Sequence, residues 1–472
     1  MERRFEVRKQ EILNEARIKP AVSNKMIERL ETFTNPFIEC LKRPEPKEYA
    51  QIYIGGLLSD LKRKNVESIA YRYDLERQNL QRFVGWAPWD HVPLLEELAR
   101  EVGTNIGEED AVIVFDPSGF KKCGNDSVGV QRQWLGRLGK IDNGQVGIYM
   151  GYASRIEHAL VDVRLYLPED WAKDKARRKK CGVPKSVRFQ TRHELALDML
   201  QTNGQFLPHQ WIAGDDEMGR SSSFRRRLDA LGEHYLLDIP SNTNVRDLAV
   251  PAPSYGGHGR PCKQPFQRVD QWSLSQSADA WTCLNVRDGD KGPLELEIAT
   301  TRVIARTERG RGDAGEELLV VTRCLDENKK VKYDYHLSNA PSETPLETLA
   351  RVVKAEHRVE DGLKRSKSEA GLADYEVRTW AGWYHHQTLS LIATWFLVQE
   401  LRRGKKIYSR HDSSSDPDTV SDVVTTSLRS EVSKLAETFC TTKKQSKRVG
   451  SFSLLQTTQL VATIKGRSKN LI

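Results

Sequence analysis

The sequence lacks the features of a membrane or secreted protein. No apolar run reaches the roughly 18 residues that a membrane-spanning helix needs. The first residues, MERRFEVRKQ, carry charge but precede no apolar stretch of the kind found in secretory signals. We therefore expect a protein that stays in the cytoplasm.

Cysteine patterns and common catalytic signatures are also missing. The seven cysteines are odd in number and form no C-x-x-C pair, so a disulfide framework or a structural zinc site is not expected. Neither the phosphate-binding pattern G-x-x-x-x-G-K-[ST] nor the hydrolase pattern G-x-S-x-G occurs. The adjacent pair His385-His386 has no further ligand at metal spacing, which favours helix packing over metal binding.

A modest excess of positive charge is present. The chain has 73 Lys and Arg against 65 Asp and Glu, a net charge of +8. This permits nucleic-acid binding without establishing it, because many basic proteins bind none. The basic residues cluster at Arg177–Lys180, Arg225–Arg227, Lys364–Lys367 and Lys443–Arg448. Each cluster is either a phosphate contact or a solvated face.

The first 105 residues or so carry apolar side chains at helical spacing. Residues 65–84 are typical of two short helices around a turn, with Arg72, Arg77, Gln78 and Arg82 exposed. As a helix-turn-helix, this segment would place its second helix on DNA. The alternative is a helical packing domain.

Strands follow, and then helices alternate with strands. The run Ala111–Phe115 predicts a buried strand that the following Pro-Ser-Gly ends, just after Asp116. Further elements are expected as strands at 145–153 and 159–167, a helix at 191–201 capped by Thr191 and Glu194, a strand at 210–213, a helix at 221–231 and a strand at 235–239. The order of three strands, helix, strand, helix, strand is that of a mixed α/β, RNase H-like (ribonuclease H-like) fold.

Residues 240–345 or so predict a β-rich insertion. Strands are expected at 294–307, 316–324 and 331–337, with a hairpin turn at 326–328. A helix at 346–370 and another at 382–402 follow, and residues 409–422 resemble a disordered linker. These patterns divide the chain into a helical N-terminal domain (1–105), a core in two parts (106–240 and 346–405), the insertion (241–345) and a linker with a basic C-terminal segment (406–472).

Carboxylates follow two of the predicted strands. Asp116 ends the first, and Asp215, with Asp216 and Glu217 beside it, ends the strand at 210–213. A carboxylate in this position is costly unless it is paired or binds a metal. A third is available on the helix at 346–370, where Glu356, Glu360, Asp361 and Glu369 compete. Three such groups could bind two Mg²⁺ for phosphodiester chemistry.

Basic side chains accompany these carboxylates. Lys364 and Lys367 share a helix face with Glu360, at four- and seven-residue spacing. Lys121, Lys122 and Arg132 lie near Asp116 in the sequence and would either reach phosphate or form a solvated loop.

Three stretches resemble bacterial insertion-sequence transposases of the DDE superfamily, in the group with a β-strand insertion. They are DPSGFKKCGNDSVGVQRQWLGRLGKIDNGQVGIYMGYAS, WIAGDDEMGRSSSFRRRLDALGEHYLLDIPSN and VEDGLKRSKSEAGLADYEVRTWAGWYHHQTLSLIATWFL. The glutamate helix of that group carries a Tyr, Arg, Glu, Lys signature; Glu360 and Lys367 fit it, whereas Val353 and Glu356 replace its Tyr and Arg. In the second stretch Met218 replaces a Tyr.

The resemblance implies Mg²⁺-dependent cleavage of double-stranded DNA at terminal inverted repeats, then strand transfer into target DNA by a homodimer. It implies two Mg²⁺ per active site, with Mn²⁺ able to substitute, and a nucleoid-associated bacterial protein. Asp116, Asp215 and Glu360 would be catalytic and bind the metals. The implied DNA-binding residues are Lys367, Lys364, Lys121, Lys122, Arg132 and Arg225.

Some alternatives remain open. In relatives a Trp of the insertion stacks on a flipped base; here Trp272 or Trp281 would serve, or both pack in the core. Other functions compatible with the sequence are a catalytically inactive or domesticated DNA-binding protein and an RNase H-like nuclease without strand transfer.

Overall fold

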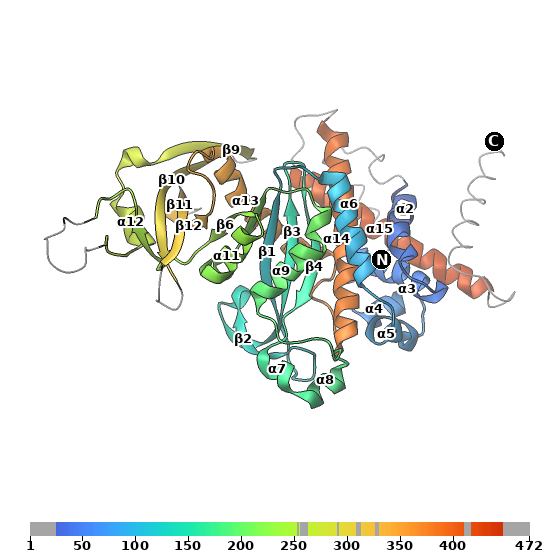
Figure 1. The fold of residues 1–472 in the computed structure, drawn as a ribbon. Helices are drawn as coiled ribbons and strands as arrows, with labels where there is room; N and C mark the ends of the chain where they lie inside the picture. Colours follow the sequence, from blue (N-terminus) through green and yellow to red (C-terminus); the bar gives the residue numbers. More distant parts are fainter. Residues whose placement is uncertain are drawn as a thin grey trace.

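The computed structural model describes residues 25–252, 254, 263–289, 292–307, 313–325, 330–409 and 417–446. Its N-terminal part is helical, as expected. The helices are α2 (Met26–Glu39), α3 (Pro44–Leu58), α4 (Val66–Arg72), α5 (Arg77–Gly85) and α6 (Val92–Ile106). Their buried apolar residues recur at helical spacing, and α2, α3, α5 and α6 pack around α14 (Trp380–Ser409) (Figure 1).

Five strands form the central part of the sheet. They are β1 (Val112–Lys121), β3 (Lys140–Ala153), β4 (His158–Leu165), β5 (Trp211–Gly214) and β6 (His234–Asp238). Their spatial order is β4-β3-β1-β5-β6; β3 is antiparallel to β1 and β4, whereas β5 and β6 run parallel to β1. The sequence order expected for an RNase H-like core, three strands followed by alternating helices and strands, is therefore present.

The prediction that Pro-Ser-Gly ends the first strand was wrong. β1 continues to Lys121 and pairs with β3 along its whole length, with Pro117 opposite Ile148. Beyond Phe115 the other neighbour, β5, no longer pairs with β1. Because proline is tolerated where a strand has an open edge, Pro117 does not interrupt it. A short strand, β2 (Gln131–Leu135), extends the sheet beyond β3 and was not predicted.

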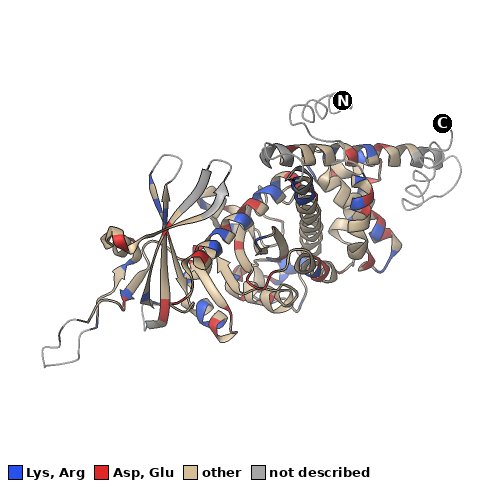
Figure 2. Cartoon of the chain, turned by 90° about the horizontal axis from the view of Figure 1, so that it is seen from above, with Lys and Arg blue, Asp and Glu red and all other residues tan. Residues whose placement is uncertain are grey.

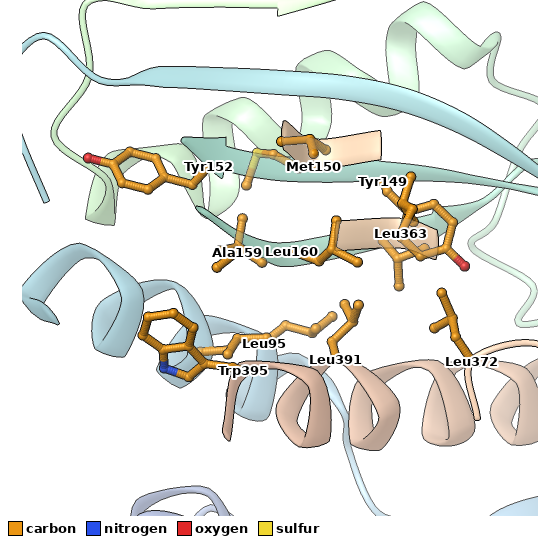
Figure 3. Packing of buried hydrophobic residues seen from close by; sticks show 14 of the residues in the cluster. Leu95, Tyr149, Met150, Tyr152, Ala159, Leu160, Leu363, Leu372, Leu391 and Trp395 are labelled. Atoms are coloured by element: carbon orange, nitrogen blue, oxygen red, sulfur yellow. The ribbon is translucent and has the colours of Figure 1, made fainter. Parts of the chain in front are cut away.

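Helices cover both faces of this core. α9 (Arg192–Thr202) lies on one face, and α13 (Leu346–Glu369) and α14 lie on the other (Figure 1). The expected capping box between Thr191 and Glu194 starts α9. Figure 3 shows Leu160 of β4 directed toward Leu391 of α14, in the apolar layer that fixes this helix on the sheet. Tyr149 of β3 donates from its hydroxyl to Gln387 of α14 at 2.6 Å. Shorter helices connect the strands: α7 (Glu169–Lys173), α8 (Lys175–Cys181), α10 (Asp216–Arg220) and α11 (Ser222–Ala230).

The insertion continues the same sheet and has a small core of its own. Its elements are β7 (Asn244–Asp247), β8 (Gln267–Arg268), α12 (Val269–Ser275), β9 (Thr282–Gly289), β10 (Gly292–Arg306), β11 (Asp313–Leu325) and β12 (Val331–Ser338). β12 pairs with β6, and this pairing joins the insertion to the central strands. Trp272 and Trp281 are both buried in the insertion core, and Trp272 donates to Asp247 at 2.7 Å, so packing accounts for both side chains.

The C-terminal part differs from the prediction of a linker at 409–422. α14 extends to Ser409, and α15 (Pro417–Ser446) begins inside the predicted linker. The reason is an apolar face on α15, where Val424, Leu428 and Val432 are buried against the N-terminal helices and α14. The expected turn at 326–328 lies outside the described residues.

None of the described helices combines the length and apolar content needed to cross a bilayer. The six cysteines in the described part of the chain are free thiols. Figure 2 shows Lys and Arg interspersed with Asp and Glu over helices and strands alike, so any DNA-binding surface must be argued from particular residues.

Candidate active site

Asp116 lies on β1 with its side chain toward α13. Side chains alternate along a strand, so Asp116 and Ser118 share one face. Lys367 of α13 donates from Nζ to the Ser118 hydroxyl oxygen at 2.7 Å, which shows that this face is the one that α13 covers. The sequence prediction of an aspartate presented on an inner strand is consistent with this placement.

Asp215 lies beside Asp116, at the end of the neighbouring parallel strand. Gly214, the last residue of β5, pairs with Phe115. Asp215 then caps α10, because its Oδ1 accepts a hydrogen bond from the Met218 amide at 3.2 Å. The cap fixes Asp215, whereas Asp216 is exposed and pairs with Arg220. Glu217, the third candidate at this position, pairs with Arg192 at 2.5 Å. Of the three acidic residues, Asp215 is therefore the one we place with Asp116.

The two aspartates oppose each other electrostatically. Burial raises the pKa of Asp116 to about 7, with Lys367 acting against the shift and Glu360 adding to it. Burial, then the charges of Asp116 and Glu217, hold the pKa of Asp215 well above its ordinary value. Like charges held close in a partly dry site favour a proton or a cation between them. Strongly perturbed carboxylates of this kind mark candidate functional sites.

α13 presents two glutamates to this region from successive turns. Glu360 is 53% exposed and lies 3.3 Å from Lys364, although its charge reaches Asp116. Glu356 is partly buried, and its pKa is held well above the ordinary value by burial and then by Asp238, Asp215 and Asp116. Glu356, one of the four competing acids of the sequence, therefore lies deeper among the carboxylates than Glu360 does.

Asp238 is a carboxylate that sequence reasoning missed. It ends β6, the next parallel strand after β5, so Asp116, Asp215 and Asp238 follow one edge of the sheet. The available signal was an acidic residue near the end of the strand expected at 235–239, whereas Asp215 comes just after its expected strand. Asp238 lies 2.5 Å from Nδ1 of the buried His336 and hydrogen-bonds Glu356. The Asp238 carboxylate is therefore already engaged in hydrogen bonds with His336 and Glu356.

The donor set suits a hard divalent cation. Carboxylate oxygens are the ligands that Mg²⁺ prefers, and the repulsion between Asp116 and Asp215 is what such an ion would relieve. Within the described residues, however, no three Asp, Glu, His or Cys side chains converge as a ready-made metal site. The side chain of Glu360, held toward Lys364, would have to turn toward Asp116 to complete one.

The basic residues named from the sequence lie in different environments. Lys121 is 58% exposed and pairs with Asp142 at 3.1 Å, and Arg132 is exposed on β2. Lys122 donates to the Tyr375 carbonyl oxygen at 3.2 Å, and burial lowers its pKa to about 8. Lys364 is exposed on α13. Lys121, Arg132 and Lys364 are thus accessible to a phosphate chain, and Lys122 is less so.

Arg225 occupies a different place from the one expected of a DNA contact. It is 3% exposed, and its guanidinium donates to both carboxylate oxygens of Glu317, at 2.6 and 3.1 Å. This pair links α11 to β11 of the insertion. Buried in this way, Arg225 cannot reach DNA in this conformation.

The two adjacent histidines of α14 have packing roles. Both are buried, His385 between the Val84 and Trp89 carbonyl oxygens and His386 against the Tyr53 hydroxyl and the Gly371 carbonyl oxygen. The interpretation of helix packing agrees with these contacts.

The sequence matches one family model and a transposase relative. The family model described as "DDE superfamily endonuclease" matches residues 36–293. A probable transposase for insertion sequence element IS701 from Microchaete diplosiphon is 28% identical over 330 residues, covering 68% of this chain and 74% of that protein. A cryo-EM structure of a piggyBac transposase synaptic complex with hairpin DNA overlaps 87% of this chain and 73% of its own at 10% identity, with a TM-score of 0.38.

Proposed function

The chain belongs to the DDE superfamily endonucleases, and we propose that it is an insertion-sequence transposase that cuts its element's ends and joins them to target DNA. The single observation that carries this is that Asp116, within β1, lies near Asp215, which directly follows the parallel strand β5, under the helix that carries Glu360 and Lys367. The similarity to the IS701 protein supports the same substrate class.

The chemistry assigned to the site is phosphodiester hydrolysis followed by transesterification. Water attacks a phosphorus atom at the element end, the P–O bond to the 3′ oxygen breaks, and that oxygen leaves as a hydroxyl. The freed 3′-hydroxyl then attacks a phosphodiester of target DNA; a new P–O3′ bond forms to the element end, the target's own P–O3′ bond breaks, and the target 3′ oxygen leaves as a hydroxyl. Bound Mg²⁺ or Mn²⁺ would supply the positive charge that stabilises the attacking and leaving oxygens.

Individual residues have separate roles in this proposal. Asp116, Asp215 and Glu360 hold the divalent cations. Lys367 is placed near Asp116 by its hydrogen bond to Ser118 and offsets negative charge that develops on the phosphate. Lys121, Arg132 and Lys364 contact the DNA backbone, which runs over the accessible face beside β1 and β2. Two copies of the chain act together on the two element ends.

A second candidate function is DNA binding without cleavage. It is favoured by one observation, that Glu360 pairs with Lys364 instead of joining Asp116 and Asp215. In that case the chain would recognise DNA ends but lack a complete site for the cation.

The test is incubation of the full chain with linear DNA that carries both ends of its own element, a supercoiled target plasmid and Mg²⁺. The transposase proposal predicts double-strand cuts at the ends, free 3′-hydroxyl termini, and joined products in the plasmid. Cleavage without joining would indicate a nuclease, and binding without cleavage in either Mg²⁺ or Mn²⁺ would favour the second candidate.

A further inference from the structure

Helices α4 and α5 form a helix-turn-helix. α4 ends at Arg72, and the chain turns through Asp74, which has a φ of 49°, before α5 begins at Arg77. Ile69 of α4 and Leu80 of α5 are fully buried, and α4 packs against α5. The pair of helices expected from the sequence at 65–84 is thus present, with its turn.

The outer face of α5 has the side chains that read DNA bases. Gln78, Gln81 and Arg82 are all exposed, at three- and four-residue spacing on one side of the helix. Glutamine pairs with adenine, and arginine with guanine, through two hydrogen bonds at major-groove edges. No Asp or Glu lies on α5, whose sequence is RQNLQRFVG. Solubility alone does not require a surface helix that has basic and amide side chains but no acidic ones.

α5 is fixed to the helix that follows the glutamate helix. Thr379 donates to the Gly85 carbonyl oxygen at 2.6 Å. The ring nitrogens of His385 lie 2.9 Å from the carbonyl oxygens of Val84 and Trp89, and the Trp89 ring stacks on the imidazole at 3.6 Å. Because all these partners are main-chain groups or stacked rings, α5 keeps a set position relative to the catalytic core.

A cavity of 320 Å³ lies beside α5 and is lined by Gln81, Trp86, Arg378 and Tyr375, with Glu67 and Glu376 also in its wall. Trp86 is 64% exposed at the end of α5. Tyr375 is buried, and Lys122, which directly follows β1, donates to its carbonyl oxygen and lies over its ring. The wall of the cavity is therefore joined to the strand that carries Asp116 through buried contacts of Tyr375.

We propose that α5 reads the base sequence of duplex DNA in the major groove through Gln78, Gln81 and Arg82, and that its clamp to α14 sets the distance from the read bases to the cut. The inference rests on the proposed function for its DNA substrate. The contact of His385 with the α5 carboxyl end makes recognition and cleavage parts of one rigid body, so the cut falls at a constant offset from the recognised bases.

The experiment is a selection from a pool of duplexes with a randomised central segment, in EDTA, by the full chain. EDTA separates reading from cutting, so the result does not depend on whether the site cleaves DNA. The wild type is expected to enrich one sequence, and Asp116→Ala the same sequence. Gln81→Ala and Arg82→Ala are each expected to lose preference at particular base pairs and bind the enriched duplex about 5- to 150-fold more weakly.

Gln201→Ala, which alters an exposed glutamine on α9, is the matched control and should select and bind as the wild type does. The proposal is overturned if the wild type enriches no sequence, or if the α5 variants enrich the wild-type sequence with unchanged affinity. It is also overturned if they weaken binding to all duplexes equally, because α5 would then contact only phosphates. Failure in any of these ways leaves cleavage by the wild type, and hence the proposed function, to be judged separately.

Discussion

Lys367 of α13 donates a hydrogen bond to Ser118 of β1 at 2.7 Å, two residues beyond Asp116. This contact joins the glutamate helix to the strand of the first aspartate. The positive charge also acts against the upward shift of the Asp116 pKa. Lys367 is therefore expected to affect both the position and the ionisation of the site.

Lys367→Ala should slow single-turnover cleavage by about 100-fold, the scale seen when one charge-stabilising donor is removed. Loss of the charge should raise the pKa of Asp116 further, so the acid limb of the pH–rate profile should move to higher pH. Lys173→Ala, which alters a 72% exposed lysine on α7, is the control and should leave that limb in place. An unchanged profile in Lys367→Ala would contradict this role.

Asp116 should make the metal-free protein less stable as pH rises. Its pKa is about 7 in the folded chain and about 3.9 when unfolded. Below about pH 3.9 Asp116 is protonated in both the folded and the unfolded chain. As the pH rises from about 3.9 to about 7, only the unfolded chain loses this proton, so the free energy of unfolding falls. Asp116→Asn should therefore raise the free energy of unfolding by up to about 4 kcal/mol at pH 8 and by little at pH 4.

Denaturant unfolding in EDTA at the two pH values measures this difference. Asp361→Asn, which alters a 71% exposed carboxylate, is the control and should show little effect at either pH. Mg²⁺ should stabilise the wild type at pH 8 but not Asp116→Asn, because only the wild type offers that carboxylate. Equal effects of Asp116→Asn at pH 4 and pH 8 would show that the pKa shift is not the cause.

Gly219 should be intolerant of any side chain. A Cβ atom there would lie 2.0 Å from the Asp238 carbonyl oxygen, so α10 or β6 would have to move. Gly219→Ala is expected to cost about 1–3 kcal/mol in the free energy of unfolding and to reduce cleavage by displacing Asp215. Gly136→Ala, where a Cβ meets nothing within 4 Å, should change neither. Wild-type stability and cleavage in Gly219→Ala would contradict the close approach of α10 to β6.

Arg225 and Arg132 should respond to substitution in opposite ways. Arg225→Ala leaves Glu317 buried without its bidentate partner and should cost about 3–5 kcal/mol in unfolding free energy. Arg132→Ala, at an exposed site on β2, should leave stability unchanged and lower the salt slope of DNA binding by about 1. Thermal unfolding and salt-dependent binding measure the two effects. Full stability of Arg225→Ala would contradict its structural role.

Much of the core could be predicted because its signals are local. The apolar runs of β1, β5 and β6 and the Thr191–Glu194 capping box mark elements within a few residues of their ends. What could not be predicted depends on contacts far apart in the chain. Pro117 continues a strand because β5 is short, and α15 is a helix because it packs against α14 and α3.

In the candidate site, too, only the features that depend on local sequence could be predicted. Asp116 and Asp215 follow apolar runs, so their positions were readable from the sequence. The approach of Glu356 to Asp238, and the burial of Arg225 against Glu317, join residues that the sequence separates by more than 90 positions. Charge and spacing along α13 alone could not show which glutamate faces inward.

Single-turnover cleavage of end-bearing DNA in Mg²⁺, with wild type compared with Asp116→Ala, tests the central claim most directly. The expected result is that the wild type releases 3′-hydroxyl ends, whereas Asp116→Ala binds the same DNA with similar affinity and does not cut it. Cleavage by Asp116→Ala at the wild-type rate would contradict the assignment of the active site to Asp116 of β1 and Asp215 beyond β5.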